Sequence, residues 1–118
     1  MNNTAIKFGD IFLVDFGEDS IGHEYKKRRP AVVIQSAKQI QRSNLITVLP
    51  ISSKLNKGLE EDILIQKDEN NLLLENSLIK VHHIMSFDYQ RIYYKIGEVG
   101  ENISQKIKDY LKIHFDLL

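Results

Sequence analysis

The sequence predicts a mainly β domain with some α structure, in which a small, strongly bent antiparallel sheet or barrel is closed by a C-terminal helix. Two observations lead to this prediction. Short segments rich in β-branched residues alternate with polar turns along most of the chain. Only the last segment carries apolar residues at three- and four-residue spacing. With 118 residues the chain is long enough for one core and too short for two, so residues 1–118 are expected to form a single domain.

Three segments in the first half of the chain are typical of strands. They are residues 11–16 (IFLVDF), 31–35 (AVVIQ) and 45–51 (LITVLPI). Pro30 opens the second of them, a place where a strand tolerates proline, and Pro50 indicates an edge or a bulge in the third. Residues 17–28 are polar and contain two glycines, which predicts a long loop, and residues 36–44 predict a loop with room for one helical turn.

The second half of the chain predicts shorter strands and one helix. Residues 62–66 (DILIQ) and 77–81 (SLIKV) are strand candidates around a turn at 68–71, and residues 92–99 favour a strand through their two tyrosines. The helical stripe consists of Ile103, Ile107, Tyr110, Leu111 and His114. Asn102 and Gln105 fit a capping box in front of this helix.

Composition excludes several classes of protein. A hydrophobic content of 42% and a charged content of 27% are ordinary for a globular chain. No apolar run is long enough for a membrane span, the start of the chain lacks the pattern of a secretory signal, and cysteine is absent. We therefore expect a cytoplasmic protein without disulfides or thiolate metal sites. No metal-binding or nucleotide-binding motif occurs, so we expect no metal and no cofactor.

Positive charge is concentrated in one place although the chain as a whole is neutral, with sixteen basic and sixteen acidic residues. Lys26, Lys27, Arg28 and Arg29 follow one another and run into Pro30. The cluster is either a solvated loop or a patch that binds an anion. Acidic residues gather elsewhere, at Glu60, Glu61, Asp62, Asp68 and Glu69.

Arg29 and Ser52 are the first candidates for a site. Arg29 precedes a proline and a buried strand, so its guanidinium is held more firmly than a loop lysine and can present two parallel hydrogen bonds to a phosphate. Ser52 ends the next strand, and antiparallel neighbours bring the start of one strand beside the end of the other. The structural alternatives are an ion pair of Arg29 with Asp15 or Glu24, and a serine that serves only the turn.

The four histidines give weaker signals. His82 and His83 are adjacent and face opposite sides of a strand, so they do not chelate one metal together. His114 lies on the apolar stripe and is expected at the core or its rim. His23 lies beside the basic cluster, where it is either a proton-transfer group or an ordinary exposed loop residue.

The order of these motifs resembles the MazF/PemK toxin family of type II toxin–antitoxin systems. The matching stretches are GDIFLVDF, GHEYKKRRPAVVIQ and LITVLPISS, and the later stretch NSLIKVHHIMSFDYQRI is similar to the family as well. Gly9-Asp10 with Asp15, Gly22-His23-Glu24, Arg29-Pro30 and Ser52 occupy the family pattern. Two positions depart from it: His23 stands where many members have Ser or Thr, and Met85 where many have arginine.

The resemblance implies an SH3-like bent antiparallel barrel of the MazF/CcdB type with a C-terminal helix. It implies a homodimeric endoribonuclease, controlled by a cognate antitoxin, that cuts single-stranded RNA through the ribose 2′-hydroxyl without a metal. Carried over by motif, the catalytic residues would be Arg29, Ser52 and Glu24. The RNA-binding residues would be His23, Lys26, Lys27, Arg28, Ser53 and Gln35. Two alternatives remain on the same fold: a CcdB-like gyrase poison, and a non-catalytic module that binds nucleic acid.

Overall fold

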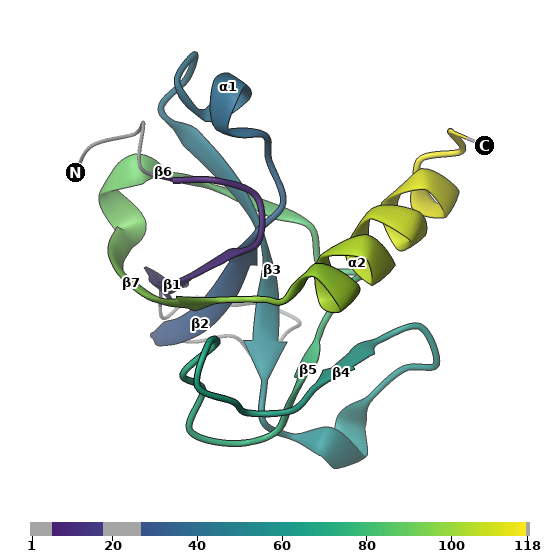
Figure 1. The fold of residues 1–118 in the computed structure, drawn as a ribbon. Helices are drawn as coiled ribbons and strands as arrows, with labels where there is room; N and C mark the ends of the chain where they lie inside the picture. The colour runs from purple at the N-terminus through teal and green to yellow at the C-terminus, as the bar shows by residue number, and fades with distance from the viewer. Residues whose placement is uncertain (1–5, 18–26, 118) are drawn as a thin grey trace.

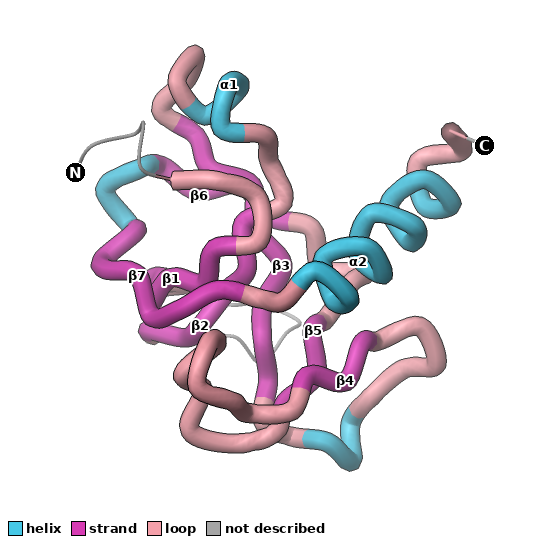
Figure 2. The backbone as a smooth tube through the Cα atoms, in the orientation of Figure 1, coloured by secondary structure: helices cyan, strands magenta, loops and turns pink. Residues whose placement is uncertain are grey.

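Seven antiparallel strands form one strongly bent sheet in the computed structural model, which describes residues 6–17 and 27–117 (Figure 1). The strands are β1 (Asp10–Asp15), β2 (Arg28–Val33), β3 (Leu45–Ser52), β4 (Ile63–Ile65), β5 (Ser77–Ile79), β6 (Met85–Asp88) and β7 (Ile92–Glu98). Their order is β4-β5-β3-β2-β1-β7, and β6 also pairs with β3. The helices are α1 (Ala37–Ile40) and α2 (Glu101–His114), with 3₁₀ turns η2 (Leu55–Lys57) and η3 (Tyr89–Arg91) (Figure 2).

The bend of the sheet is located on β3, the longest strand. Residues 45–48 of β3 pair with β6, whereas residues 51 and 52 pair with β5. Pro50 lies between these two sections, where a residue without an N–H interrupts the ladder least, and its carbonyl accepts a hydrogen bond from Lys80 N at 2.9 Å. The irregularity predicted at Pro50 is therefore a change of partner strand inside the sheet.

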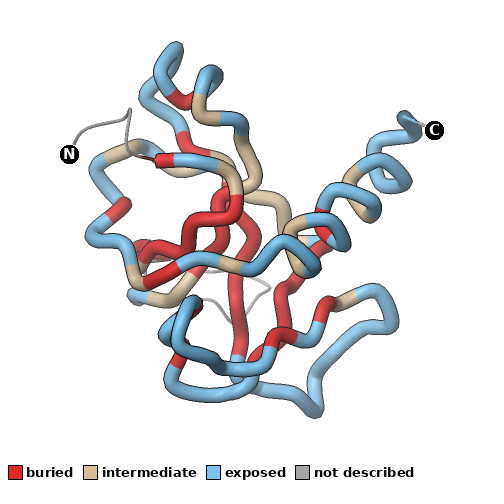
Figure 3. Tube along the Cα trace, in the orientation of Figure 1, coloured by how far each residue is buried: buried red, intermediate tan, exposed pale blue. Residues whose placement is uncertain are grey.

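Side chains alternate between two hydrophobic clusters along β1, β2 and β3. Val14, Val33 and Val48 belong to the first cluster, which β6 and the start of β7 cover. Val32 and Leu49 belong to the second, on which α2 packs through the fully buried Ile107. Figure 3 shows the buried segments concentrated on the central strands, while most of α2 is exposed. None of the helices in the described residues is long and apolar enough to span a membrane.

The predicted strands are all present, with shifted ends, while two expectations were wrong and one strand was missed. β2 begins at Arg28, so Pro30 lies inside the strand, opposite Leu13 of β1. The helix α2 has Gly100 as its N-cap, without a side-chain hydrogen bond, and Asn102 lies within the helix, so the capping box is wrong. The strand β6 was not predicted, whereas the helical turn expected between residues 36 and 44 is confirmed as α1, capped by Ser36.

The loop between β4 and β5 is held in one conformation by its own polar groups. Asn71 is 2% exposed, and its Oδ1 accepts hydrogen bonds from Asp68 N and Leu73 N, at 3.1 and 3.0 Å. Its Nδ2 donates to Gln66 O at 2.9 Å. A Cβ at Gly97 of β7 would lie 2.5 Å from Asn71 O, so only glycine lets this loop lie against β7 so closely.

Candidate nucleic-acid interface

Arg29 lies within the sheet, which fixes its backbone more firmly than a position ahead of the strand would. It is the second residue of β2 and stands opposite Val14 of β1. Among the residues that the structure describes, its side chain has no ion-pair partner, so the alternative of a pair with Asp15 is not found. Asp15 Oδ1 instead accepts a hydrogen bond from Gly17 N at 2.8 Å. The Nε atom of Arg29 is buried and has no hydrogen-bond partner.

The end of β3 lies beside the start of β2, as the sequence predicted for Ser52. Ala31 stands opposite Pro50 in the last pair of the β2–β3 ladder, so the start of β2 and the end of β3 are neighbours, although Ser52 is not among the residues that line a hollow with Arg29. Ser52 is only 6% exposed, and its Oγ accepts a hydrogen bond from Lys54 N at 3.2 Å. Ser53 is exposed and lines the same hollow as Arg29. The two serines thus differ in access, because one is buried under the turn and the other lies at the surface.

This hollow, which we call the Arg29 hollow, has a volume of about 190 Å³ and is formed by three parts of the chain. It is lined by Arg29 and Pro30 of β2, Ile51 and Ser53 at the end of β3, and Leu73, Leu74, Glu75 and Ser77 of the β4–β5 loop and β5. Leu74 is 91% exposed. The contribution of Leu74 and Glu75 was not predicted from the sequence. Three consecutive leucines in an otherwise polar loop were the available signal.

Lys27 and Arg28 each make a specific contact at the start of β2. The Arg28 guanidinium carbon lies 4.0 Å from the centre of the Tyr93 ring, a cation–π contact that holds the side chain against β7. Lys27 has a positive φ of 62° and its N donates to Gly17 O at 2.7 Å. Both residues are exposed and line a second hollow together with Asp15 and Gly17. The predicted candidates His23, Glu24 and Lys26 lie outside the described residues.

Gln35 is not brought to the Arg29 hollow. It follows the far end of β2, about 20 Å from Arg29 at the usual rise per residue of a strand. Its Oε1 accepts a hydrogen bond from Thr47 N at 3.1 Å, so the side chain fastens β2 to β3. Met85 contributes to packing, because it stands opposite Val48 and packs against the first hydrophobic cluster.

His82 and His114 belong to a hydrogen-bonded chain at α2, together with Glu61 and Tyr110. His82 Nε2 lies 2.9 Å from Glu61 Oε1, and the Tyr110 hydroxyl lies 3.0 Å from both His82 Nδ1 and His114 Nδ1. The hydrogen bond from His82 lowers the pKa of Glu61, and burial, with the nearby charge of Glu61, raises the pKa of Tyr110. These contacts connect α2 to the segments that precede β4 and follow β5. In the described part of the protein, no three acidic or histidine side chains cluster as metal ligands.

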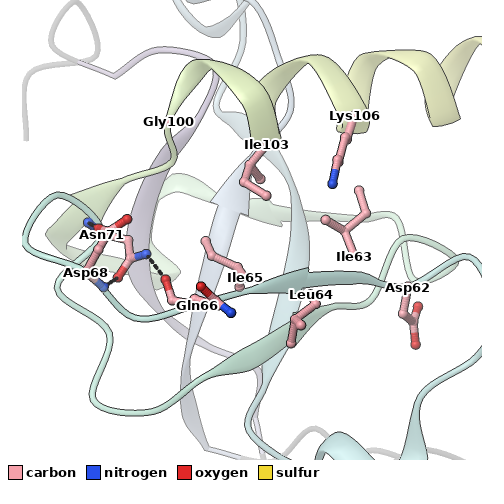
Figure 4. Close-up of a pocket in the computed structure, with 10 residues that line it drawn as sticks. All are labelled: Asp62, Ile63, Leu64, Ile65, Gln66, Asp68, Asn71, Gly100, Ile103 and Lys106. Atoms are coloured by element: carbon pink, nitrogen blue, oxygen red, sulfur yellow. Dashed lines mark hydrogen bonds between the residues drawn. The ribbon is translucent and has the colours of Figure 1, made fainter.

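A groove of about 490 Å³, larger than the Arg29 hollow, lies between β4 and α2 (Figure 4). It is lined by Asp62, by Ile63–Ile65 of β4, by Gln66, Asp68 and Asn71 of the following loop, and by Gly100, Ile103 and Lys106 on the helix side. None of the candidate site residues lines it, so the basic residues at the start of β2 and this groove are separate surfaces.

Comparison with known proteins assigns the family and the fold. A model of the family described as PemK-like, MazF-like toxin of type II toxin–antitoxin systems matches residues 7–115. The structure of MazF (Form-I) from Deinococcus radiodurans is similar with a TM-score of 0.77 and 20% identity, over 94% of this chain and 96% of that chain. No curated protein matches the sequence significantly.

Two mycobacterial structures have the same fold. The Mycobacterium tuberculosis toxin MazF-mt6 gives a TM-score of 0.72 at 16% identity, over 91% of this chain and 96% of that chain. An endoribonuclease in complex with its cognate antitoxin, from a mycobacterial species, gives a TM-score of 0.72 at 14% identity, over 98% and 96%. At these identities the structures establish the fold, and the bent barrel of the MazF type with its C-terminal helix is confirmed.

Proposed function

Because this chain belongs to the PemK-like, MazF-like toxin family of type II toxin–antitoxin systems, a family known as endoribonucleases, we propose that it is a sequence-specific endoribonuclease. Its substrate is single-stranded RNA, including mRNA, and its action inhibits translation and growth. The observation that carries the proposal is the Arg29 hollow, where a buried guanidinium nitrogen without a partner lies next to the serine end of β3.

The proposed reaction uses the ribose 2′-hydroxyl of the substrate as the nucleophile. Its oxygen forms a bond to the neighbouring phosphorus while the bond from phosphorus to the 5′-oxygen breaks, which leaves a 2′,3′-cyclic phosphate and a 5′-hydroxyl. The 2′-hydroxyl gives up its proton and the leaving oxygen gains one, so atoms and charges balance. An internal nucleophile needs positioning and charge stabilisation and no activated water, so the reaction is metal-independent.

Arg29 stabilises the charge that develops on the phosphorus oxygens. An arginine stays protonated, so its role is electrostatic and hydrogen-bond donating. The Ser52 hydroxyl accepts from Lys54 N and keeps its own hydrogen for a phosphate oxygen. Glu24 is the candidate base for the 2′-hydroxyl, because a carboxylate accepts a proton more readily than a serine hydroxyl does.

The flanking phosphates are bound by the remaining basic residues. Arg28 and Lys27 are exposed next to the start of β2, and Lys26, His23 and Ser53 extend the proposed RNA surface. Gln35 contributes only to RNA that runs along the whole of β2. Such contacts make binding strongly dependent on salt. We further propose a homodimer that is inhibited by a cognate antitoxin in the cytoplasm, supported by the similar structure of an endoribonuclease with its antitoxin.

Incubation of the purified protein with end-labelled single-stranded RNA in EDTA tests the proposal. The expected result is cleavage with a 2′,3′-cyclic phosphate on one fragment and a 5′-hydroxyl on the other. Binding without cleavage would support the non-catalytic module instead. Arrest of gyrase on DNA, with intact RNA, would support the gyrase poison. Cleavage that stops in EDTA and returns with a divalent metal would contradict the metal-independent mechanism.

A further inference from the structure

The Arg29 hollow contains charges of both signs that do not contact each other. Arg29 lines it from β2 and Glu75 lines it from the β4–β5 loop. In residues 6–17 and 27–117 neither side chain takes part in an ion pair, and Arg29 Nε is buried without a hydrogen-bond partner. A ligand that fits between them has an anionic part for the guanidinium and hydrogen-bond donors for the carboxylate. A nucleotide has both, in its phosphate and in its base.

The loop that carries Glu75 is held in place by a buried side chain and by hydrogen bonds. Leu73 is 8% exposed and packs in the second hydrophobic cluster, which anchors the loop just before Leu74. Lys67 N donates to Asn76 Oδ1 at 2.9 Å, and Ser77 Oγ donates to Glu75 O at 2.9 Å. Groups held in this way keep their geometry before a ligand arrives, so little ordering is needed on binding.

Leu74 and Glu75 present complementary surfaces to a base. Leu74 is 91% exposed, and a leucine so exposed offers an apolar surface for the flat face of an unstacked base. The Glu75 carboxylate only accepts hydrogen bonds. Proteins recognise single-stranded RNA by contacting such faces and by hydrogen bonds to the Watson–Crick edges of splayed-out bases.

We infer that Leu74 and Glu75 form a base subsite that selects guanine at a nucleotide next to the phosphate held by Arg29. The inference rests on the proposed function. Guanine is the base with two adjacent donors on its Watson–Crick edge, N1–H and the N2 amino group, and a carboxylate accepts both in a bidentate contact. Adenine and cytosine place an acceptor nitrogen beside their single amino donor, and uracil places carbonyl oxygens on both sides of its N3–H. Each of these would set an acceptor against the carboxylate.

Substitution of single bases in an RNA substrate, including one that removes a single amino group, tests this subsite. A full digest of a long RNA first gives a short substrate, in which the nucleotides flanking the cut are then varied between guanosine, inosine and uridine. Inosine lacks only the N2 amino group. For the wild-type protein, guanosine at one flanking position should be cut about 10-fold faster than uridine, with inosine in between, since a good bidentate contact discriminates by this order.

Two variants separate the subsite from the rest of the loop. Glu75→Gln replaces one acceptor oxygen by a donor, so the guanosine–inosine difference at that position should disappear while other positions keep their preference. Glu69→Gln, an exposed glutamate of the same loop that does not line the hollow, should behave as the wild type.

Cleavage without a guanine preference at either flanking nucleotide would overturn the base subsite and leave the endoribonuclease proposal intact. The same conclusion follows if Glu75→Gln retains the wild-type ratio of guanosine to inosine cleavage. If the wild-type protein cleaves no RNA, both proposals are wrong.

Discussion

Asp10 at the start of β1 and Arg29 at the start of β2 differ in whether their buried polar atoms have partners in the protein. Asp10 is fully buried, and its carboxylate is surrounded by partners: Lys7 Nζ lies 2.8 Å and Lys95 Nζ 3.2 Å from Oδ1, and Lys7 N donates to Oδ2. Arg29 lies on the neighbouring strand, has a buried Nε, and finds no partner for it. The same sheet therefore contains one charge that its neighbours satisfy and one that they do not.

The difference separates charges that stabilise the fold from charges that are available to a ligand. A buried polar group without a hydrogen bond costs about 1–3 kcal/mol of stability. Asp10 avoids that cost through its lysines, whereas Arg29 bears it in the free protein. On the proposed function, a phosphate that reaches the Arg29 guanidinium would supply the missing acceptor, and this gain would contribute to the free energy of binding.

The largest effect is expected from the most deeply buried ion pair. Lys80 Nζ lies 2.6 Å from Asp62 Oδ2, with both side chains at most 5% exposed. Asp62→Ala leaves the lysine buried without its partner, so the free energy of unfolding in urea should fall by about 3–5 kcal/mol. The double variant Asp62→Leu/Lys80→Met removes both charges and should recover most of the loss. A single variant within 1 kcal/mol of wild type would show that Lys80 is not held by Asp62.

Arg29→Ala tests the residue whose buried Nε has no hydrogen-bond partner. RNA cleavage should fall by roughly 100-fold or more, the size of effect seen when one charge-stabilising donor is removed. The urea midpoint should stay unchanged or rise, because no hydrogen bond or ion pair of the guanidinium within the described residues is lost, and its buried Nε has no partner. Arg29→Lys keeps the charge without the planar fork and should recover only part of the activity. Wild-type cleavage by Arg29→Ala would remove this residue from the mechanism.

Asp10→Asn should act on stability and leave cleavage unchanged. It keeps the shape of the side chain and removes the charge that Lys7 and Lys95 face, so about 1.5–3 kcal/mol of unfolding free energy should be lost, the range for hydrogen bonds to charged groups. Rates on a short RNA and a urea titration of the same preparation measure both effects. A fall in cleavage rate without a fall in stability would place Asp10 in the RNA site.

The smallest effect concerns the pH dependence of stability. It comes from Glu98, an exposed carboxylate that contacts the same two lysines as Asp10. Hydrogen bonds from Lys7 and Lys95 lower the pKa of Glu98 from its ordinary 4.5, so its stabilisation is present above that value and is lost as the pH falls through the lowered pKa. The hydrogen bond to Asp10 raises the pKa of Lys7 above 10.5, so its contribution is present below 10.5 and is lost in more alkaline solution. Glu98→Gln should reduce the drop in thermal midpoint between pH 7 and pH 3. An unchanged drop would assign the acid sensitivity to other carboxylates.

The sheet could be predicted because its central strands are buried on both faces, between two hydrophobic clusters, and therefore appear in the sequence as short, continuous apolar runs rich in β-branched residues between polar turns. The strand β6 could not, since Met85–Asp88 is short and its Ser86 and Asp88 face solvent. The capping box failed for a similar reason: Gly100 begins α2 without any side-chain signal.

The proximity of the start of β2 and the end of β3 follows from the antiparallel order of neighbouring strands, which the sequence supports. The same rule separates Gln35 from them, because it lies at the other end of β2. Glu75 was beyond reach, since its position in the hollow depends on how the β4–β5 loop folds back past β5 and β3 toward β2. The conformation of such a loop depends on side-chain hydrogen bonds like those of Asn71. These bonds leave no periodic pattern in the amino-acid sequence.

The absent side chain at Gly97 ties the geometry of this loop to a distant strand. A methyl group there would meet the carbonyl oxygen of Asn71 at 2.5 Å, and the loop backbone would have to move. Leu74 and Glu75 would move with it, although residue 97 does not line the hollow. On the proposed function, a single base change in the codon for residue 97 that shifts Leu74 and Glu75 would alter the cutting preference while every residue that lines the hollow stays the same.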